Sequence, residues 1–345
     1  MPVSGTVTYR PTINTVINDA LAQVGAFDIE SGGAPTAAQT AMALRMANYL
    51  VKTWGTRGMQ LWERRWAVVF PQQGQATYVL GSPGPAGDHA TLTTPLDSNF
   101  IQTTLTTGAA AGDFTIDVTS LTAQLNTVGS PGVTITTGYN IGIQLDDGTV
   151  QWTTVNGAPV GTVVTITAAL TDSASSGNYV YCYQTKLIRP LRVTDAFVRQ
   201  LSSSNGPAYN DTPVRIMSRE EYNMFGQKYS QGTPVQIYYD PQSNTGNLYI
   251  YPVFQNVQQV LFIQFEKPID DFASASDDFD MPQEWAEALM WNIAWRMCPA
   301  YQVPSKQAAD IKELAVFTYD QVDSWDQEVA SLTIQPSNWP QMEGN

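Results

Sequence analysis

Apolar residues that recur every three to four positions predict two short helices near the start of the chain. Thr12 is placed to cap a helix over residues 12–25, which Gly25 ends, and Thr36 opens a second helix that loosens at Gly55. Each apolar stripe covers one side only, so the pair forms a hairpin of helices that needs a further packing partner. The stripes consist of Ile13, Val16, Ile17, Ala20, Leu21 and Val24 in the first helix, and Ala41, Leu44, Ala47, Leu50, Val51 and Trp54 in the second.

From about Leu61 the apolar period changes from that of a helix to that of a strand. "WAVVFPQQGQATYVLG" predicts two short strands around a polar turn, and a Pro/Gly-rich linker follows. Between residues 100 and 185 five short segments alternate apolar and polar positions, and Asp147-Gly148 marks a tight hairpin turn. This spacing is typical of a small β-sandwich or barrel. The block contains no Lys or Arg, unlike its flanks, which indicates a domain inserted into a host fold.

The host pattern resumes at residue 186 with a strand, "KLIRPLRVTDAFVRQ". Ser218, with Glu221 three positions on, forms the capping box of a short helix. "PVQIYYDPQSNTGNLYIYPV" then predicts a hairpin that turns at Asn244 and Gly246, and "QVLFIQFEKPI" predicts a last strand.

The segment "DDFDMPQEWAEALMWNIAWRM" predicts a helix over about 281–298 that is apolar almost all round. Asp280 is expected to cap it, Pro282 lies in its first turn, and Gln283 completes a capping box. Only Glu284, Glu287, Asn292 and Arg296 interrupt its apolar surface. A helix of this kind is buried on more than one side, so we expect it at the centre of a bundle. Another long helix is predicted over 305–330.

These elements predict an α+β fold in which N- and C-terminal helices form a bundle packed on a β region. The predicted parts are an N-terminal helix pair (1–60), a β region with one short helix (61–99 and 186–268), an inserted all-β sandwich or barrel (100–185), a C-terminal helix pair (269–331) and an extended C-terminal arm (332–345).

The composition indicates a protein that works through interfaces. Charged residues make up 14% of the chain and aromatic residues 11%, and protein interfaces are poor in charge and rich in Tyr and Trp. The net charge of −14 is uneven, because residues 268–345 hold fourteen acidic and three basic residues. A tight grip on DNA phosphates needs basic patches, which the sequence does not offer.

The sequence gives little support to a metal, cofactor or catalytic site. Cys182 and Cys298 lie far apart, without metal-binding spacing, and we expect both to be reduced and buried. The lone histidine, His89, falls in a Pro/Gly loop and is expected to be exposed. A hydrolase that uses adjacent carboxylates is the weakest hypothesis, because neighbouring side chains diverge and glycoside hydrolysis needs two that converge. Its candidates would be Asp146/Asp147, Asp270/Asp271 and Asp277/Asp278. No nucleotide-binding loop, secretory leader or membrane-spanning run is expected.

Three stretches together resemble the head-to-tail adaptor family of short-tailed bacteriophages, the tail tubular protein A-like proteins. They are the N-terminal pair "INDALAQVG" and "ANYLVKTWGTRG", the segment "PVRIMSREEYNMF" with "KYSQGTPVQIYYDPQSNTGNLYIYPV", and "DDFDMPQEWAEALMWNIAWRMCPAYQVP". The resemblance covers both ends of the host fold and not the 100–185 insert. It implies a non-enzymatic virion protein that forms a dodecameric ring between the portal protein and the tail nozzle, seals the portal and continues the DNA channel.

The resemblance also suggests candidate interface residues. The segment after residue 331 is expected to reach the portal as an arm anchored by Leu332, Ile334 and Trp339, and Trp291 and Trp295 are candidates for the contact between subunits. Negative walls keep DNA from adhering to a channel, so Asp320, Asp323 and Asp326 are channel-lining candidates, with the basic N-terminal helices as the alternative.

The alternative function is a carbohydrate-binding or host-contacting tail component that uses aromatic side chains of the insert. The candidates are Tyr139, Trp152, Tyr179, Tyr181 and Tyr183. Strand alternation favours a different role for them, in the core of the insert.

Overall fold

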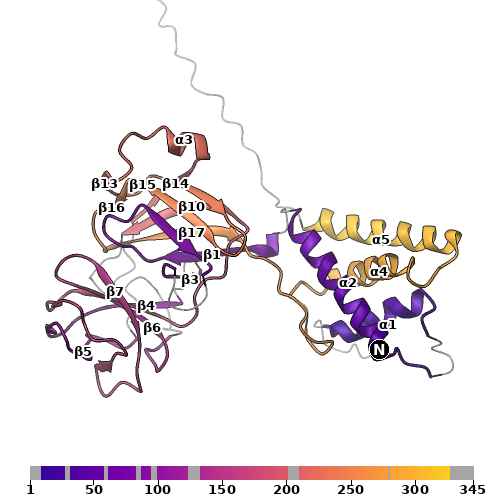
Figure 1. The fold of residues 1–345 in the computed structure, drawn as a ribbon, viewed down its shortest axis with the longest axis horizontal. Helices are drawn as coiled ribbons and strands as arrows, with labels where there is room; N and C mark the ends of the chain where they lie inside the picture. Colours follow the sequence, from indigo (N-terminus) through magenta and orange to yellow (C-terminus); the bar gives the residue numbers. More distant parts are fainter. Residues whose placement is uncertain are drawn as a thin grey trace, which may run out of the picture. The chain divides into compact units, whose positions relative to one another are not determined.

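The computed structural model shows a mixed α+β protein that divides into two compact units. A helical unit comprises residues 1–62 and 269–345, and a β unit comprises residues 63–268 (Figure 1). The structure describes residues 9–27, 32–57, 61–82, 87–94, 99–122, 133–200, 210–278 and 280–326. Within these ranges, none of the helices is long and apolar enough to cross a membrane.

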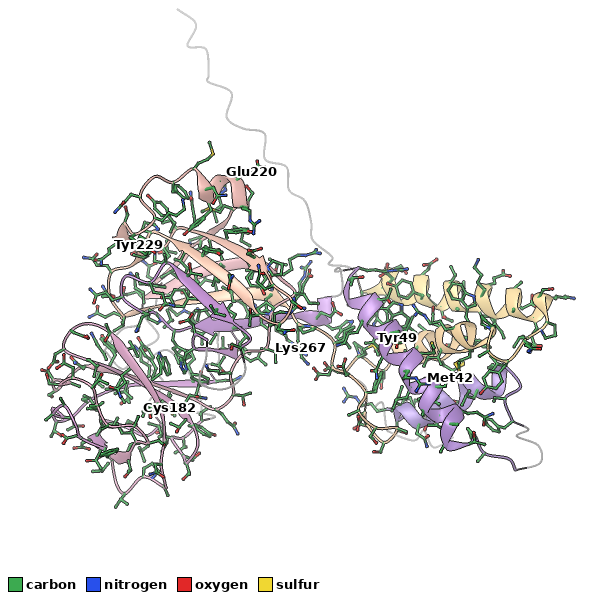
Figure 2. All side chains as sticks on the ribbon, in the orientation of Figure 1. Met42, Tyr49, Cys182, Glu220, Tyr229 and Lys267 are labelled. Carbon is green, nitrogen blue, oxygen red and sulfur yellow. The ribbon has the colours of Figure 1, made fainter. Side chains whose placement is uncertain are left out.

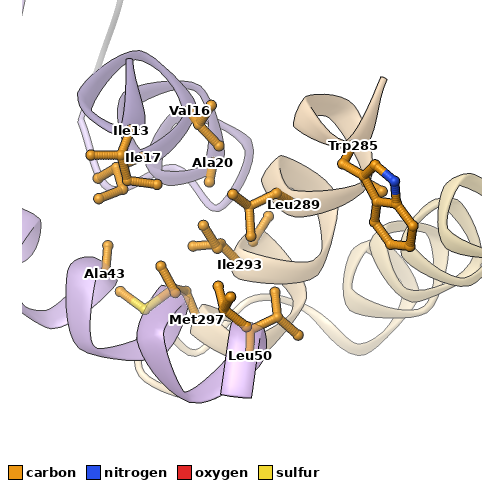
Figure 3. Close-up of a cluster of buried hydrophobic side chains, with 14 of the residues drawn as sticks. Ile13, Val16, Ile17, Ala20, Ala43, Leu50, Trp285, Leu289, Ile293 and Met297 are labelled. Carbon is orange, nitrogen blue, oxygen red and sulfur yellow. The ribbon is translucent and has the colours of Figure 1, made fainter. Parts of the chain in front are cut away.

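The helical unit is built around one central helix. Helix α4 (Trp285–Met297) packs against α1 (Ile13–Gln23), α2 (Ala37–Gly55) and α5 (Ser305–Trp325). Figure 3 shows Leu289 and Ile293 of α4 facing the apolar side chains of α1, with Leu50 of α2 close to Met297. The four helices share one core, which explains why α4 carries apolar residues on several sides.

Local capping signals set the first two helices as predicted. The Thr12 hydroxyl accepts a hydrogen bond from the Thr15 amide, and Thr36 forms a capping box with Gln39. Gly25 adopts the positive φ that ends α1. The stripe of α2 differs from the prediction at one position, because Ala43 is buried and Ala41 is exposed.

Helix α4 begins later than predicted. It starts at Trp285 rather than near residue 281, and Asp280 is therefore not its cap. The lead-in is a tight turn, in which the Trp285 amide donates to the Pro282 carbonyl at 3.1 Å. Met281 is buried in the helical core, which holds the chain outside the helix at this point. Helix α5 likewise ends at Trp325, before the predicted residue 330.

The burial of Asn292 in α4 also differs from the sequence prediction. It was expected to interrupt the apolar surface, but it is buried between α4 and α5. Its amide group donates to the Ala288 carbonyl at 2.8 Å and to the Ala315 carbonyl of α5 at 2.9 Å. The buried polar side chain is thus satisfied by hydrogen bonds that join the two helices.

The β unit contains open, mostly antiparallel sheets, none of which closes into a barrel within the described residues. The largest has the order β11-β10-β17-β1-β3, and the next has the order β12-β14-β15-β2. Their strands are β1 (Arg64–Val69), β2 (Thr77–Leu80), β3 (Ala90–Thr93), β10 (Arg192–Gln200), β11 (Asn210–Pro213), β12 (Arg215–Ile216), β14 (Gln236–Pro241), β15 (Gly246–Tyr251) and β17 (Gln259–Glu266). Ser218 forms the predicted capping box of the short helix α3 (Arg219–Asn223), and β13 (Gln231–Gly232) pairs with β16 (Val253–Phe254).

Residues 100–183 contribute two further sheets, β4-β9-β6-β7 and β5-β8. Their strands are β4 (Phe100–Thr104), β5 (Thr115–Asp117), β6 (Asn140–Gln144), β7 (Val150–Thr154), β8 (Val163–Thr165) and β9 (Tyr179–Tyr183). The tight turn predicted at Asp147-Gly148 joins β6 to β7, and Gly148 has a φ of +90°.

The central five-stranded sheet is covered on both faces, which explains the continuous apolar run of "WAVVF". Ala67 and Val69 of β1 face a core shared with β14 and β15, whereas Val68 and Phe70 face a second core. The second core contains Phe100, Tyr181 and Tyr183 from the 100–183 region. The two strands predicted around the polar turn both form, as β1 and β2, but each pairs in a different sheet.

Candidate functional site

The outer side of helix α5 carries several exposed apolar side chains. Ile311, Ala315, Thr318 and Tyr319 are buried, and the other residues from 312 to 317 are exposed on the outer side of the helix. Leu314, Val316 and Phe317 are 40%, 44% and 63% exposed. Because monomeric proteins seldom leave several large apolar side chains exposed together, this surface is a candidate protein contact.

Acidic residues accompany the apolar side chains on this surface. Asp310, Glu313 and Asp320 are exposed, and none of them forms an ion pair with a described residue. Lys312 is nearby, with its Nζ atom 5.7 Å from the centre of the Trp295 ring of α4. We call Asp310, Glu313, Leu314, Val316, Phe317 and Asp320 the outer face of α5.

The three channel-lining candidates of α5 have different surroundings. Asp320 is exposed on the outer face, and Asp323 is half-buried and accepts a hydrogen bond from the Tyr319 hydroxyl at 3.4 Å. Asp326 is only 7% exposed. Its carboxylate is therefore the least accessible of the three candidates.

The tryptophans of α4 divide by burial. Trp285 is fully buried, Trp291 is half-buried against the helical core, and Trp295 is 38% exposed. Trp295 therefore retains a free edge for a contact with another molecule. Leu332, Ile334 and Trp339, the anchors predicted for the arm, lie outside the described residues.

A run of apolar residues in the sequence predicts the exposed outer face of α5, although acidic residues lie on both sides of it. Leu314, Ala315, Val316 and Phe317 are four consecutive apolar residues inside a helix. Successive helical residues are about 100° apart, so such a run cannot turn all its side chains to one core.

His89 is structured rather than exposed in a loop, contrary to the expectation from sequence. Its ring stacks on Trp152, with ring centres 3.9 Å apart, and its Nδ1 atom lies 2.7 Å from the Tyr183 hydroxyl. Burial, with a smaller contribution from the positive charge of Lys186, lowers the pKa of His89 to about 3. The ring is therefore neutral at physiological pH and serves as a packing element between the central sheet and the β4-β9-β6-β7 sheet.

We expect acid to destabilise the β unit through His89. The unfolded ring binds a proton below its ordinary pKa of about 6.5, whereas the folded ring does so only near pH 3. Stability is thus complete above pH 6.5 and falls as the pH drops toward 3. Between pH 7 and pH 5 the loss should be about 1 kcal/mol, half the full linkage value because the ring is partly exposed. Denaturant melts at the two pH values should show this loss, and His89→Gln should abolish it; an equal loss in both proteins would contradict the assignment.

Four of the insert's aromatic candidates, Trp152, Tyr179, Tyr181 and Tyr183, pack with residues of the central sheet, and Tyr139 packs against the core of the insert. Tyr181 and Tyr183 are fully buried, and the Tyr181 hydroxyl donates to the Val257 carbonyl. His89 covers one face of the Trp152 ring. The other face lies over Gly142, where an added Cβ would approach three ring atoms to 2.8 Å. Trp152 therefore has no open face on which a sugar could stack.

Gly142→Ala should destabilise the β unit by about 1–3 kcal/mol, because the new methyl group meets a ring that His89 prevents from moving away. Gly226→Ala is a matched control, since a Cβ there meets nothing within 4 Å. Chemical denaturation should show a change within about 0.5 kcal/mol for the control. Equal stability of both variants would mean that Trp152 is free to shift.

The neighbouring acids Asp146 and Asp147 stabilise loops. Asp146 accepts hydrogen bonds from the Ser173 hydroxyl and the Ser175 amide, and Asp147 from the hydroxyl and amide of Thr149. These bonds lower the pKa of both carboxyl groups. In the part of the chain that the structure describes, no three His, Cys, Asp or Glu side chains are grouped in a way that could hold a metal ion.

No protein-family model matches the chain, and a comparison with curated proteins gives no match.

Proposed function

We propose that this protein is a virion head-to-tail adaptor, a structural protein that forms a ring between the portal protein and the tail nozzle. The observation that carries the proposal is the outer face of α5, where large apolar side chains are exposed beside a fully packed core. Apolar area left exposed in this way is stabilising only when a protein partner covers it. The three stretches that resemble the adaptor family supply the kind of assembly, with a dodecamer expected.

In the proposed adaptor, each of the two units has its own role. The helical unit supplies contacts between subunits, with Trp291 and Trp295 as further candidates. The β unit supplies a surface for the nozzle, with residues 100–185 as an inserted domain. Asp323 remains a candidate for the channel wall, past which DNA moves without sequence-specific contacts, whereas Asp320 belongs to the outer face of α5.

The direct test is the mass of the assembly. The purified protein should be measured by native mass spectrometry alone and with the portal protein encoded by the same genome. We expect one discrete ring complex with portal, whatever the state of the free protein, because assembly can require the template. Absence of any complex over a wide concentration range would overturn the proposal. Binding of the full-length protein to a glycan array would instead favour the carbohydrate-binding alternative, which the covered Trp152 ring disfavours.

Truncation after Ser331 should weaken portal binding by at least about 30-fold, because apolar anchors at the centre of an interface each contribute about 2 kcal/mol. Ile334→Ala with Trp339→Ala should reproduce most of this loss, whereas Gln341→Ala in the same segment should not. Fluorescence anisotropy with labelled portal measures the affinity. Unchanged binding of the truncated protein would exclude the arm and leave the ring proposal standing.

A further inference from the structure

Helix α2 presents an outer face that is opposite in charge to the outer face of α5. Ala41, Arg45, Tyr49 and Lys52 recur at helical spacing on the side away from the core, and Tyr49 is 59% exposed. Figure 2 labels Tyr49 on this helix. The helix contains no acidic residue. Ala41, Arg45, Tyr49 and Lys52 are the outer face of α2.

The charges on the two faces are largely without partners in their own chain. Arg45 forms no ion pair with a described residue, while Lys52 pairs with Asp271 at 2.6 Å. On α5, Asp310, Glu313 and Asp320 are also without an ion pair among the described residues. Each face also has one exposed aromatic ring, Tyr49 on α2 and Phe317 on α5.

We infer that the outer face of α5 in one copy packs against the outer face of α2 in the next copy. This inference rests on the proposed ring and names its contact. The apolar contact of Phe317 and Tyr49 supplies buried area, and the pairing of Glu313 or Asp320 with Arg45 fixes orientation. Exposed ion pairs alone are weak, so the charges select the partner face more than they hold it.

The same charges argue against a symmetric contact. If α5 packed on α5 of a second copy, Glu313 and Asp320 would face acidic residues, and like charges across an interface are repulsive. The faces of α2 and α5 lie on different helices that both pack on α4. When two copies join through two different faces, the pair still has one free α2 face and one free α5 face. Further copies can therefore add head to tail until a ring closes.

Charge reversal tests the contact in the full-length protein assembled with portal. Arg45→Glu and Glu313→Arg should each lower the yield of the ring complex by at least about tenfold, because each brings like charges together. The double variant Arg45→Glu, Glu313→Arg should restore the yield to within about twofold of the unchanged protein. Both positions are exposed, so the variants are expected to fold normally.

Cross-linking with a short bis-maleimide tests proximity independently. Arg45→Cys with Glu313→Cys should give a ladder of covalent oligomers in the assembled ring, whereas Thr15→Cys with Glu313→Cys should not, because Thr15 is exposed on α1. The native Cys182 and Cys298 are buried and do not interfere. A ring that forms with portal but shows neither the ladder nor the rescue overturns this contact and leaves the proposed function intact. Absence of any ring overturns both.

Discussion

Trp285→Ala is expected to lower the free energy of unfolding of the helical unit by about 3–5 kcal/mol, the usual cost of removing a large buried ring. Trp285 is fully buried at the first turn of α4. Its ring centre lies 5.5 Å from that of Trp54, 6.3 Å from that of Trp62 and 5.8 Å from that of Tyr319. Alanine would leave a cavity bordered by α2 and α5, whose other contacts hold them in place and prevent collapse.

The loss should come from packing and not from a broken hydrogen bond. The Trp285 indole nitrogen is buried and has no hydrogen-bond partner in the described structure. Trp285→Phe, which retains most of the ring contact without the unpaired N–H group, should therefore recover more than half of the lost stability.

Trp295→Ala is the matched control for this prediction, because the same residue type lies on the same helix with a 38% exposed side chain. It should cost no more than about 1 kcal/mol. Guanidinium melts followed by near-ultraviolet circular dichroism compare the variants. Equal losses for Trp285→Ala and Trp295→Ala would mean that α4 is not the central helix of the unit in solution.

The sequence predicts where a helix starts when a capping hydrogen bond between near neighbours sets that start. Thr12, Thr36 and Ser218 cap α1, α2 and α3 as expected, because a capping hydrogen bond joins residues only three positions apart. The start of α4 was predicted wrongly from the same kind of signal. There, burial of Met281 in the helical core outweighed the capping preference of Asp280, and burial depends on segments distant in sequence.

Alternation along the strands was predictable, but the partner of each strand face was not. In "YVYCY" the alternating residues do separate to the two faces of β9, with Val180 and Cys182 in the core of the insert. The tyrosines face the central sheet instead of that core, because the insert packs on Val68 and Phe262. The environment of His89 follows from the same long-range contact, so its Pro/Gly neighbours in sequence gave no indication of it.

The candidate interface on α5 differs in position from the interface residues that the sequence suggested. Low charge and many aromatic residues predict a protein of interfaces, which stays a prediction, and Trp295 is exposed on α4. On α5 the acidic residues suggested a channel wall, and no contact was predicted for the apolar run of residues 314–317 between them. Whether Phe317 or Tyr319 would face the core depends on the angle at which α5 packs on α4, which no local pattern determines.

Phe317→Asp is expected to abolish ring assembly while leaving the fold unchanged. The side chain is 63% exposed on the outside of a helix, so its replacement should change the free energy of unfolding by about 0.5 kcal/mol or less. In the proposed ring, the new carboxylate would replace the apolar contact with Tyr49 and would be buried beside Glu313 and Asp320 of its own helix, at every subunit contact. We therefore expect binding between copies to weaken by at least about 100-fold.

Two control variants separate the loss of a contact from a general effect of charge. Phe317→Leu keeps an apolar side chain and should assemble close to normally, and Thr15→Asp adds the same charge to the exposed side of α1, away from the proposed contact. Sedimentation velocity with portal, together with circular dichroism of each variant, measures assembly and fold in parallel. Normal assembly of Phe317→Asp would place the subunit contact elsewhere, because an apolar residue that a neighbour covers cannot accept a charge there without cost.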